Sequence, residues 1–126
     1  GLIIVTNDGD LANKIAHPSN HVKKTYIATL DGRLSENQMK KFSEGVVIDS
    51  KKTLPAEIEL YDFSQAMYKI SIYEGRNRQI RKMLETLGYE IKSLKRVKVG
   101  ELTLGSLEVG HYRPLTEDEI KYLKNL

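Results

Sequence analysis

The sequence predicts an α+β domain whose largely antiparallel (mixed) sheet is flanked by helices. Segments with strand-like alternation outnumber segments with helical spacing, and short turns join several of them into hairpins. One segment has the opposite pattern, because Ile80, Met83, Leu84 and Leu87 form the apolar stripe of an amphipathic helix. The chain has 126 residues, of which 40% are apolar, so it can bury a core as one domain or as part of one.

The first half of the chain divides into four expected elements. Asn7-Asp8-Gly9 is a turn sequence, and Asp10 is positioned to cap the helix that follows. Ser35 with Gln38 has the pattern of a capping box, which predicts the start of a second helix. The elements are a buried strand at 2–6, a short helix that stops near His17, a strand at 25–30 and the second helix, which ends at Gly45.

The second half is expected to be richer in strands. Residues 56–63 and 67–73 alternate in polarity around Ser64-Gln65-Ala66, which predicts a hairpin. The amphipathic helix is expected to begin at Asn77 and to end at Gly88. The remaining expected elements are a short strand at 46–48, a strand at 91–99, edge strands at 102–104 and 112–115, and a terminal helix from Thr116 that turns Ile120 and Leu123 inward.

The composition excludes several classes of chemistry. The chain has no cysteine, so it holds no disulfide, thiol nucleophile or cysteine-ligated zinc. Its three histidines lack the spacing of metal ligands, so no metal site is expected. No apolar run approaches the ~20 residues of a membrane span, and the first residues do not resemble a secretory leader. We therefore expect a cytoplasmic protein that contacts no membrane.

The positive charge is concentrated in one part of the chain. The net charge is +3, yet residues 76–98 carry eight basic and two acidic side chains, which gives them +6 and leaves −3 for the rest. Such a distribution favours a polyanionic partner, and nucleic acid is the interpretation that we prefer. The strand at 91–99 supports it, because Lys92, Leu94, Arg96 and Lys98 are expected to share one face. The alternative is an ordinary solvent-exposed basic surface.

The densest basic motif is the string from Glu74 to Lys82. A glycine turn in it brings a set of polar side chains to the start of a helix, namely Arg76, Asn77, Arg78 and Gln79. A helix N-terminus attracts anions through its free N–H groups and its dipole. Arg78 lies one turn before Arg81, and like charges so placed repel unless an anion neutralises them. The motif predicts a phosphate contact or a carboxylate held by one arginine. A solvent-exposed face with Glu85 as the partner of Lys82 explains the lysine but not the arginines.

A second basic motif precedes the strand at 25–30. Lys23 and Lys24 come directly before Thr25 and Tyr26, so a phosphate contact and a stacked base could lie together there. Tyr26 by itself has the alternative interpretation of a half-buried strand tyrosine.

Several segments, in this order, resemble the pseudouridine synthases that modify ribosomal RNA in bacteria. The resemblance is to the branch whose members also carry an N-terminal S4-like RNA-binding domain, and it covers nearly the whole chain. The segments that carry it are residues 1–15 (GLIIVTNDGDLANKI), His17-Pro18-Ser19, Lys24-Thr25-Tyr26, residues 74–83 (EGRNRQIRKM), residues 94–100 (LKRVKVG) and residues 112–116 (YRPLT). The resemblance implies isomerisation of uridine in ribosomal RNA without a cofactor.

The resemblance also implies roles for individual residues. Tyr26 matches the family tyrosine that stacks on the target base, and Arg81 matches the arginine that pairs with the catalytic aspartate, so these two are the expected catalytic residues. Leu94 matches the leucine that packs beneath the flipped base. The other expected RNA contacts are Lys24, Arg76, Asn77, Arg78, Gln79 and Arg96.

The sequence departs from the family at the essential aspartate. That residue belongs to a Gly-Arg-Leu-Asp motif about five residues before the Gly-Leu pair that is Gly1-Leu2 here. We therefore expect residues 1–126 to be the C-terminal portion of a catalytic domain, without the S4-like domain or the aspartate, and to be inactive by themselves. The alternative function is a non-catalytic RNA-binding module that uses the basic residues 76–98. A weaker third is an acid–base hydrolase that uses Asp8 or Glu74.

Overall fold

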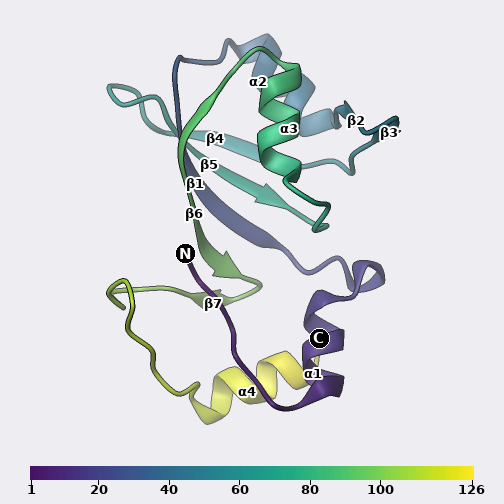
Figure 1. The fold of residues 1–126 in the computed structure, drawn as a ribbon, viewed down its shortest axis with the longest axis vertical. Coiled ribbons are helices and arrows are strands. Elements are labelled where there is room, and N and C mark those ends of the chain that lie inside the picture. The colour runs from purple at the N-terminus through teal and green to yellow at the C-terminus, as the bar shows by residue number, and fades with distance from the viewer.

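The chain folds into an antiparallel sheet with two helices on one face and a smaller group of elements at one end (Figure 1). The computed structural model describes the backbone of residues 1–126 and every side chain except that of Pro18. Its elements are α1 (Gly9–Ala16), a 3₁₀ helix (Pro18–Asn20), β1 (Lys24–Leu30), α2 (Glu36–Glu44), β2 (Val47–Ile48), β3 (Lys51–Lys52), β4 (Glu57–Asp62), β5 (Met67–Ile72), α3 (Gln79–Thr86), β6 (Ile91–Val99), β7 (Leu102–Thr103) and α4 (Glu117–Lys124).

The sheet has five strands in the order β4-β5-β1-β6-β7, and every neighbouring pair is antiparallel. The strands β2 and β3 form a separate two-stranded sheet. The predicted α+β class with an antiparallel sheet is confirmed. None of the helices in the described part of the chain is long and apolar enough to cross a membrane.

Two apolar cores stabilise the two parts of the molecule. The larger core lies between the sheet and the helices α2 and α3, where Phe42, Tyr68 and Met83 are buried. The smaller core joins α1, β7 and α4 through Leu11, Leu102 and Leu123. Figure 1 shows β6 running from the first part toward the second, so this strand connects them.

Local sequence signals set the starts of α2 and α4 as predicted. The Ser35 hydroxyl accepts a hydrogen bond from the Gln38 N–H at 3.2 Å, and the Gln38 side chain accepts one from the Ser35 N–H at 3.0 Å. This reciprocal pair is the capping box that the sequence predicted for α2. The expected hairpin is also present, because β4 and β5 pair around residues 63–66.

The predicted buried strand at 2–6 is wrong. Ile3 and Val5 are 74% and 90% exposed, and the segment has no regular strand structure. Its backbone hydrogen bond to the sheet runs from the Leu2 N–H to the Arg96 carbonyl at 2.8 Å. An apolar, β-branched run needs a partner strand along its length to become a strand, and here only Leu2 is paired in this way.

Four smaller expectations are also corrected. Asp8, not Asp10, caps α1, because its carboxylate accepts the Leu11 N–H at 3.1 Å. The helix α3 begins at Gln79 and not at Asn77. Residues 112–115 form no strand, and the Arg113 side chain turns to the Glu119 carboxylate of α4 instead. Ile120 remains 37% exposed, whereas Leu123 is buried as expected.

Two register shifts change the predicted faces of β6. They fall opposite Thr25/Tyr26 and Thr29/Leu30 of β1, so the residues of β6 do not alternate simply along its length. Arg96 lies opposite Tyr26 but Lys98 lies opposite Thr25, and residues directly opposite each other point to the same face. The expectation that Lys98 shares a face with Arg96 is therefore wrong.

We expect Phe42→Ala to lower the free energy of unfolding by about 3–5 kcal/mol, because it removes a ring from the larger core. Phe63→Ala is the matched control, since the Phe42 side chain is 0% exposed and the Phe63 side chain is 62% exposed. Phe63→Ala is expected to lower the free energy of unfolding by less than about 1.5 kcal/mol. This figure includes the loss of the contact between the Arg33 guanidinium and the Phe63 ring. Urea denaturation of both variants measures the difference, and equal losses would contradict the placement of this core.

Candidate functional site

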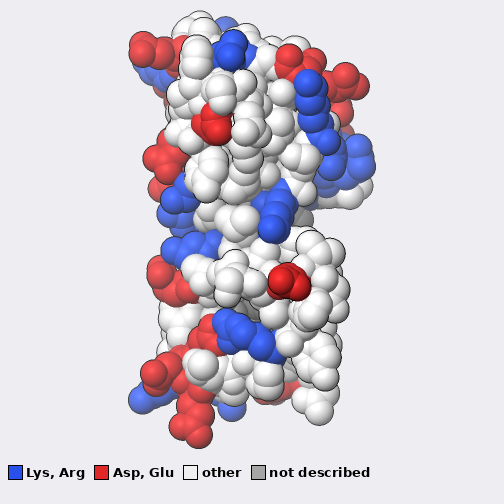
Figure 2. Space-filling model, turned by 90° about the vertical axis from the view of Figure 1, so that its left-hand side faces the viewer, with Lys and Arg blue, Asp and Glu red and all other residues white. Residues whose placement is uncertain are grey.

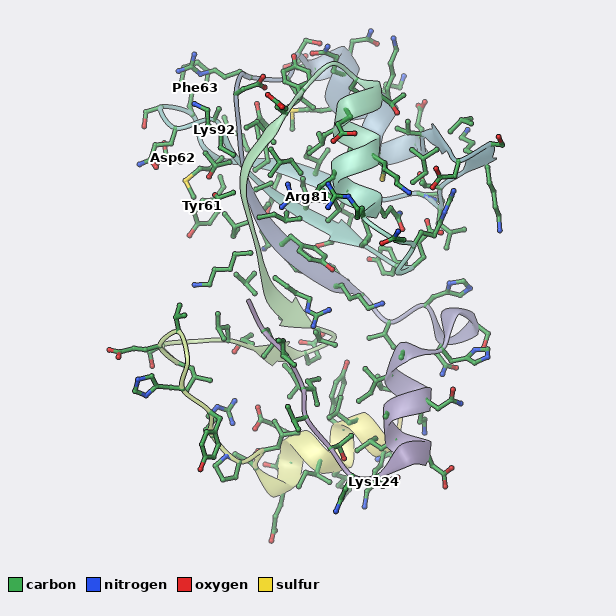
Figure 3. The ribbon with its side chains drawn as sticks, viewed as in Figure 1. Tyr61, Asp62, Phe63, Arg81, Lys92 and Lys124 are labelled. Atoms are coloured by element: carbon green, nitrogen blue, oxygen red, sulfur yellow. The ribbon has the colours of Figure 1, made fainter. Side chains whose placement is uncertain are left out.

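A cleft of about 260 Å³ lies where the sheet meets the start of α3. Tyr26 of β1 and Arg81 of α3 both line it, so the two residues with expected catalytic roles share one cavity. Figure 3 shows Arg81 near the beginning of α3, on the side toward the sheet. Six of the seven other expected site residues line the same cleft: Lys24, Arg76, Arg78, Gln79, Leu94 and Arg96. Asn77 is exposed and is not among the residues that line it.

The strand register places the sheet residues of this cleft. Tyr26 lies opposite Ile70 of β5 on one side and opposite Arg96 of β6 on the other. Directly opposed residues share a face, so Tyr26 and Arg96 are both on the face that α3 covers. Leu94 lies opposite Ala28, two residues further along the same face, and packs against the larger core. The sheet therefore forms one wall and α3 the other.

The loop before α3 is held by hydrogen bonds from a buried glutamine. The Gln79 side chain is 3% exposed; its oxygen accepts the Arg76 N–H at 3.2 Å, and its nitrogen donates to the Glu74 carboxylate at 3.1 Å. The Leu54 N–H also donates to that carboxylate, at 2.6 Å. Glu74 and Gln79 thus brace the loop, a structural use that the sequence motif did not reveal.

Two cations of the motif bind the two-stranded sheet of β2 and β3. The Arg76 guanidinium donates to the Ile48 carbonyl at 2.6 Å and to the Lys51 carbonyl at 3.1 Å. The Lys82 ammonium lies 2.7 Å from the Asp49 carboxylate, so its partner is Asp49 and not the expected Glu85. Asp49 lies 33 residues before Lys82 in the chain, and no sequence spacing pointed to it.

Arg78 and Arg81 differ from these two cations. Among the side chains that the structure describes, neither guanidinium makes a hydrogen bond or an ion pair within the chain. Arg78 has left-handed backbone angles, φ 51° and ψ 35°, directly before the helix. Such a conformation costs a non-glycine residue about 1 kcal/mol or more and is concentrated at functional sites. The two guanidinium groups that line the cleft without a protein partner are the ones available to an anion.

Arg96 binds the first residues of the chain. Its guanidinium donates to the Leu2 carbonyl from Nε at 2.9 Å and from Nη2 at 2.7 Å. Lys24 lies in the same wall of the cleft, and its pKa is lowered from the usual 10.5 by burial first and by the positive charge of Arg96 second. Two cations are therefore held together at the edge of the cleft.

The basic residues 76–98 do not form one continuous surface. Arg76, Lys82, Arg96 and Lys98 contact acceptors within the chain, and the shift in β6 separates Lys98 from Arg96. Figure 2 shows Lys and Arg interspersed with Asp and Glu over the face that it presents, with no continuous basic patch among the described residues. The charge excess of the sequence is thus divided between several faces, and the cleft holds only part of it.

A sequence model of the RNA pseudouridylate synthase family matches residues 1–86. The chain belongs to this family. It is 38% identical over 130 residues to ribosomal large subunit pseudouridine synthase B of Bacillus subtilis. The matched region covers 100% of this chain and 53% of that protein. It is also 38% identical over 126 residues to ribosomal small subunit pseudouridine synthase A of Haemophilus influenzae, over 98% of this chain and 53% of the other.

A crystal structure of a pseudouridylate synthase has the same fold. It superposes with a TM-score of 0.88 at 37% identity and covers 94% of this chain and 52% of that one. The predicted resemblance to pseudouridine synthases is confirmed, and the chain spans about half the length of these relatives. The residues that the family model matches include Tyr26 and Arg81, whose catalytic roles stay predictions.

We expect Lys24 to titrate below the usual pKa of 10.5, and the variant Arg96→Gln to raise that pKa only in part. The variant removes the neighbouring positive charge but leaves the burial that is the larger cause. NMR titration of the lysine Nζ resonances measures both values. A Lys24 pKa at or above 10.5 in the unmodified protein would contradict this environment.

Proposed function

We propose that this chain supplies the base-binding part of a site that converts uridine to pseudouridine in ribosomal RNA. The observation that carries the proposal is that Tyr26 and Arg81 line one cleft between β1 and α3. The relatives are named as synthases that act on the large and the small ribosomal subunit, which supports ribosomal RNA as the substrate class.

In this proposal Arg81 holds the catalytic carboxylate of the family. A carboxylate beside a guanidinium has a lowered pKa, so it stays ionised, and paired hydrogen bonds fix its orientation. Arg81 suits this role because its guanidinium faces the cleft and has no acceptor among the described side chains of the chain. The reaction needs no co-reactant, since the bond from C1′ to N1 breaks, C1′ bonds to C5, and the C5 proton is lost while N1 gains one.

Tyr26 is proposed to stack on the target base. The family tyrosine that it matches has a second suggested role, the removal of the C5 proton. Stacking needs only the face of the ring, so it is the better supported part of the role. Leu94 lies on the same face of the sheet and would pack beneath the base. Extruding a base from its stack costs a few kcal/mol, which stacking and phosphate contacts must offset. Arg78 and Lys24, at the margin of the cleft, are suited to those phosphate contacts.

Three of the four remaining expected RNA contacts have structural partners. Arg76, Gln79 and Arg96 line the cleft, but each also bonds to another part of the chain. We propose that they shape the cleft first and contact RNA second. Asn77, which is exposed in the loop before α3, remains a prediction as an RNA contact.

We propose that residues 1–126 form the C-terminal portion of the catalytic domain and do not isomerise uridine by themselves. The tripeptide Gly32-Arg33-Leu34 resembles the start of the aspartate motif, but Ser35 follows it and caps α2. A protein that extends this chain upstream through a Gly-Arg-Leu-Asp motif is expected to be active. Tritium release from RNA that contains 5-tritiated uridine compares the two, and activity of the 126 residues alone would contradict the proposal.

In the extended protein, Arg81→Ala is expected to lower the turnover rate by about a hundredfold or more, because the carboxylate loses the group that orients it. Arg33→Ala is the control. Arg33 is exposed and stacks on the Phe63 ring, and Figure 3 shows Phe63 at the far end of the sheet from Arg81. Turnover within about twofold of normal in Arg81→Ala would remove this residue from the site.

We expect Tyr26→Ala to weaken RNA binding by about 1–3 kcal/mol, the usual contribution of one stacked base. Tyr26→Phe keeps the ring and is expected to retain RNA binding while it lowers the rate of isomerisation. Binding is measured by fluorescence anisotropy, with Tyr61→Ala on the exposed edge strand β4 as the control. Equal rates for the unmodified protein and Tyr26→Phe would leave stacking as the only role of this residue, and unchanged binding in Tyr26→Ala would contradict stacking itself.

A further inference from the structure

A second and larger cavity adjoins the cleft. It has a volume of about 630 Å³ and lies between the first residues of the chain, α1 and the loop before α3. Lys24, Gly75, Arg76 and Arg96 line both cavities, so the two share one wall. A Cβ atom at position 75 would lie 2.9 Å from the Lys24 ammonium, so glycine leaves room in that wall. The volume is within the range of about 300–1,000 Å³ that is usual for small-molecule sites.

The two sides of this cavity differ in chemistry. One side is cationic and is formed by Lys24, Lys51, Arg76 and Arg96, with Glu74 as the acidic residue of the lining. The Glu74 carboxylate already accepts hydrogen bonds from Leu54 and Gln79, so it offers little to neutralise the cations.

The opposite side is apolar. Ile3 and Ile4 of the first segment and Ala12, Ile15 and Ala16 of α1 line it. An aromatic ring or a ribose can lie against such a surface, whereas a phosphate prefers the cationic side. A nucleotide contains both parts within one small molecule.

Charge crowding at the shared wall also favours an anion. The pKa of Lys24 is lowered by burial and by Arg96, which shows that the charged lysine is poorly compensated there. A phosphate group between Lys24 and Arg96 would supply that compensation. The same group would lie at the boundary between the two cavities.

We propose that the second cavity binds the nucleotide next to the target uridine in a single-stranded stretch of RNA. Its phosphate lies on the cationic side and its base and ribose lie against the apolar side. The inference rests on the proposed function, because that function places the target uridine in the adjoining cleft. Specific recognition of RNA commonly uses splayed single-stranded nucleotides, and this arrangement would hold two consecutive nucleotides in separate cavities.

Two adjacent lysines of β3 offer a matched test of the cationic side. Lys51 and Lys52 are both exposed, but only Lys51 lines the cavity. Binding of a labelled pentaribonucleotide with one central uridine is measured by fluorescence anisotropy over a range of salt concentrations. We expect Lys51→Glu to weaken binding about tenfold and to reduce the salt slope by about 0.7, the change for one lost contact to a single strand. Lys52→Glu is expected to weaken binding less than about twofold.

The apolar side is tested with a second pair of variants on α1. Ala16→Trp places a large ring in the cavity, whereas Asn13→Trp adds the same ring at an exposed position that does not line it. Two further pentaribonucleotides lack the base on the 5′ or on the 3′ side of the uridine. We expect one of these two strands to bind the unmodified protein more weakly than the complete strand does, and the same difference in Asn13→Trp. In Ala16→Trp the complete strand and that shortened strand are expected to bind equally well, because the added ring fills the cavity.

The outcomes separate this inference from the proposed function. Equal weakening by Lys51→Glu and Lys52→Glu, or equal binding of all three strands, overturns the second nucleotide site. If Tyr26→Ala still weakens binding in that case, the proposed stacking in the cleft stands. If Tyr26→Ala has no effect while Lys51→Glu does, the cavity binds nucleotide but the proposed function fails.

Discussion

The register of β1 between β5 and β6 is the constraint on which the cleft depends. Tyr26 faces α3 because it pairs with Ile70 on one side and with Arg96 on the other. A slip of one residue would turn Tyr26 to the opposite face and bring Thr25 into its place. The buried hydrogen bond between the Thr25 and Ser71 hydroxyls, at 2.9 Å, opposes such a slip because both groups would lose a partner. The register shifts lie between β1 and β6, and the pairing of β1 with β5 has none.

The arginines of the motif at residues 74–82 fall into two groups at the start of α3: one is bound within the chain, and two line the cleft without a partner among the described side chains. Arg76 is bound to the β2–β3 sheet, and Gln79 fixes the loop around it. Arg78 and Arg81, two and five residues after Arg76, are left facing the cleft. These hydrogen bonds fix the loop, and the two guanidinium groups that line the cleft are in place before any anion arrives, which favours anion binding.

The first residues of the chain are clamped to Arg96, a residue that lines both cavities. Arg96 holds the Leu2 carbonyl with two hydrogen bonds, and its own carbonyl accepts the Leu2 N–H. Gly1 lies so close to β6 that a Cβ atom at this position would be 2.9 Å from the backbone nitrogen of Arg96. This clamp stabilises an otherwise exposed segment along the wall that both cavities share. Ile3 and Ile4 then line the second cavity although they are not buried in a strand.

The sequence by itself determined the features that depend on near neighbours in the chain. The capping box at Ser35, the hairpin at 63–66 and the stripe of α3 are local patterns, and the family motifs pointed to Tyr26 and Arg81. Only the tertiary structure decided which cations are free, because Arg76 and Lys82 are bound by residues about 25 to 33 positions away. The tertiary structure also decided that residues 2–6 form no strand and on which face of the sheet each β6 side chain lies. Pairing with neighbouring strands, and not local propensity, sets both features.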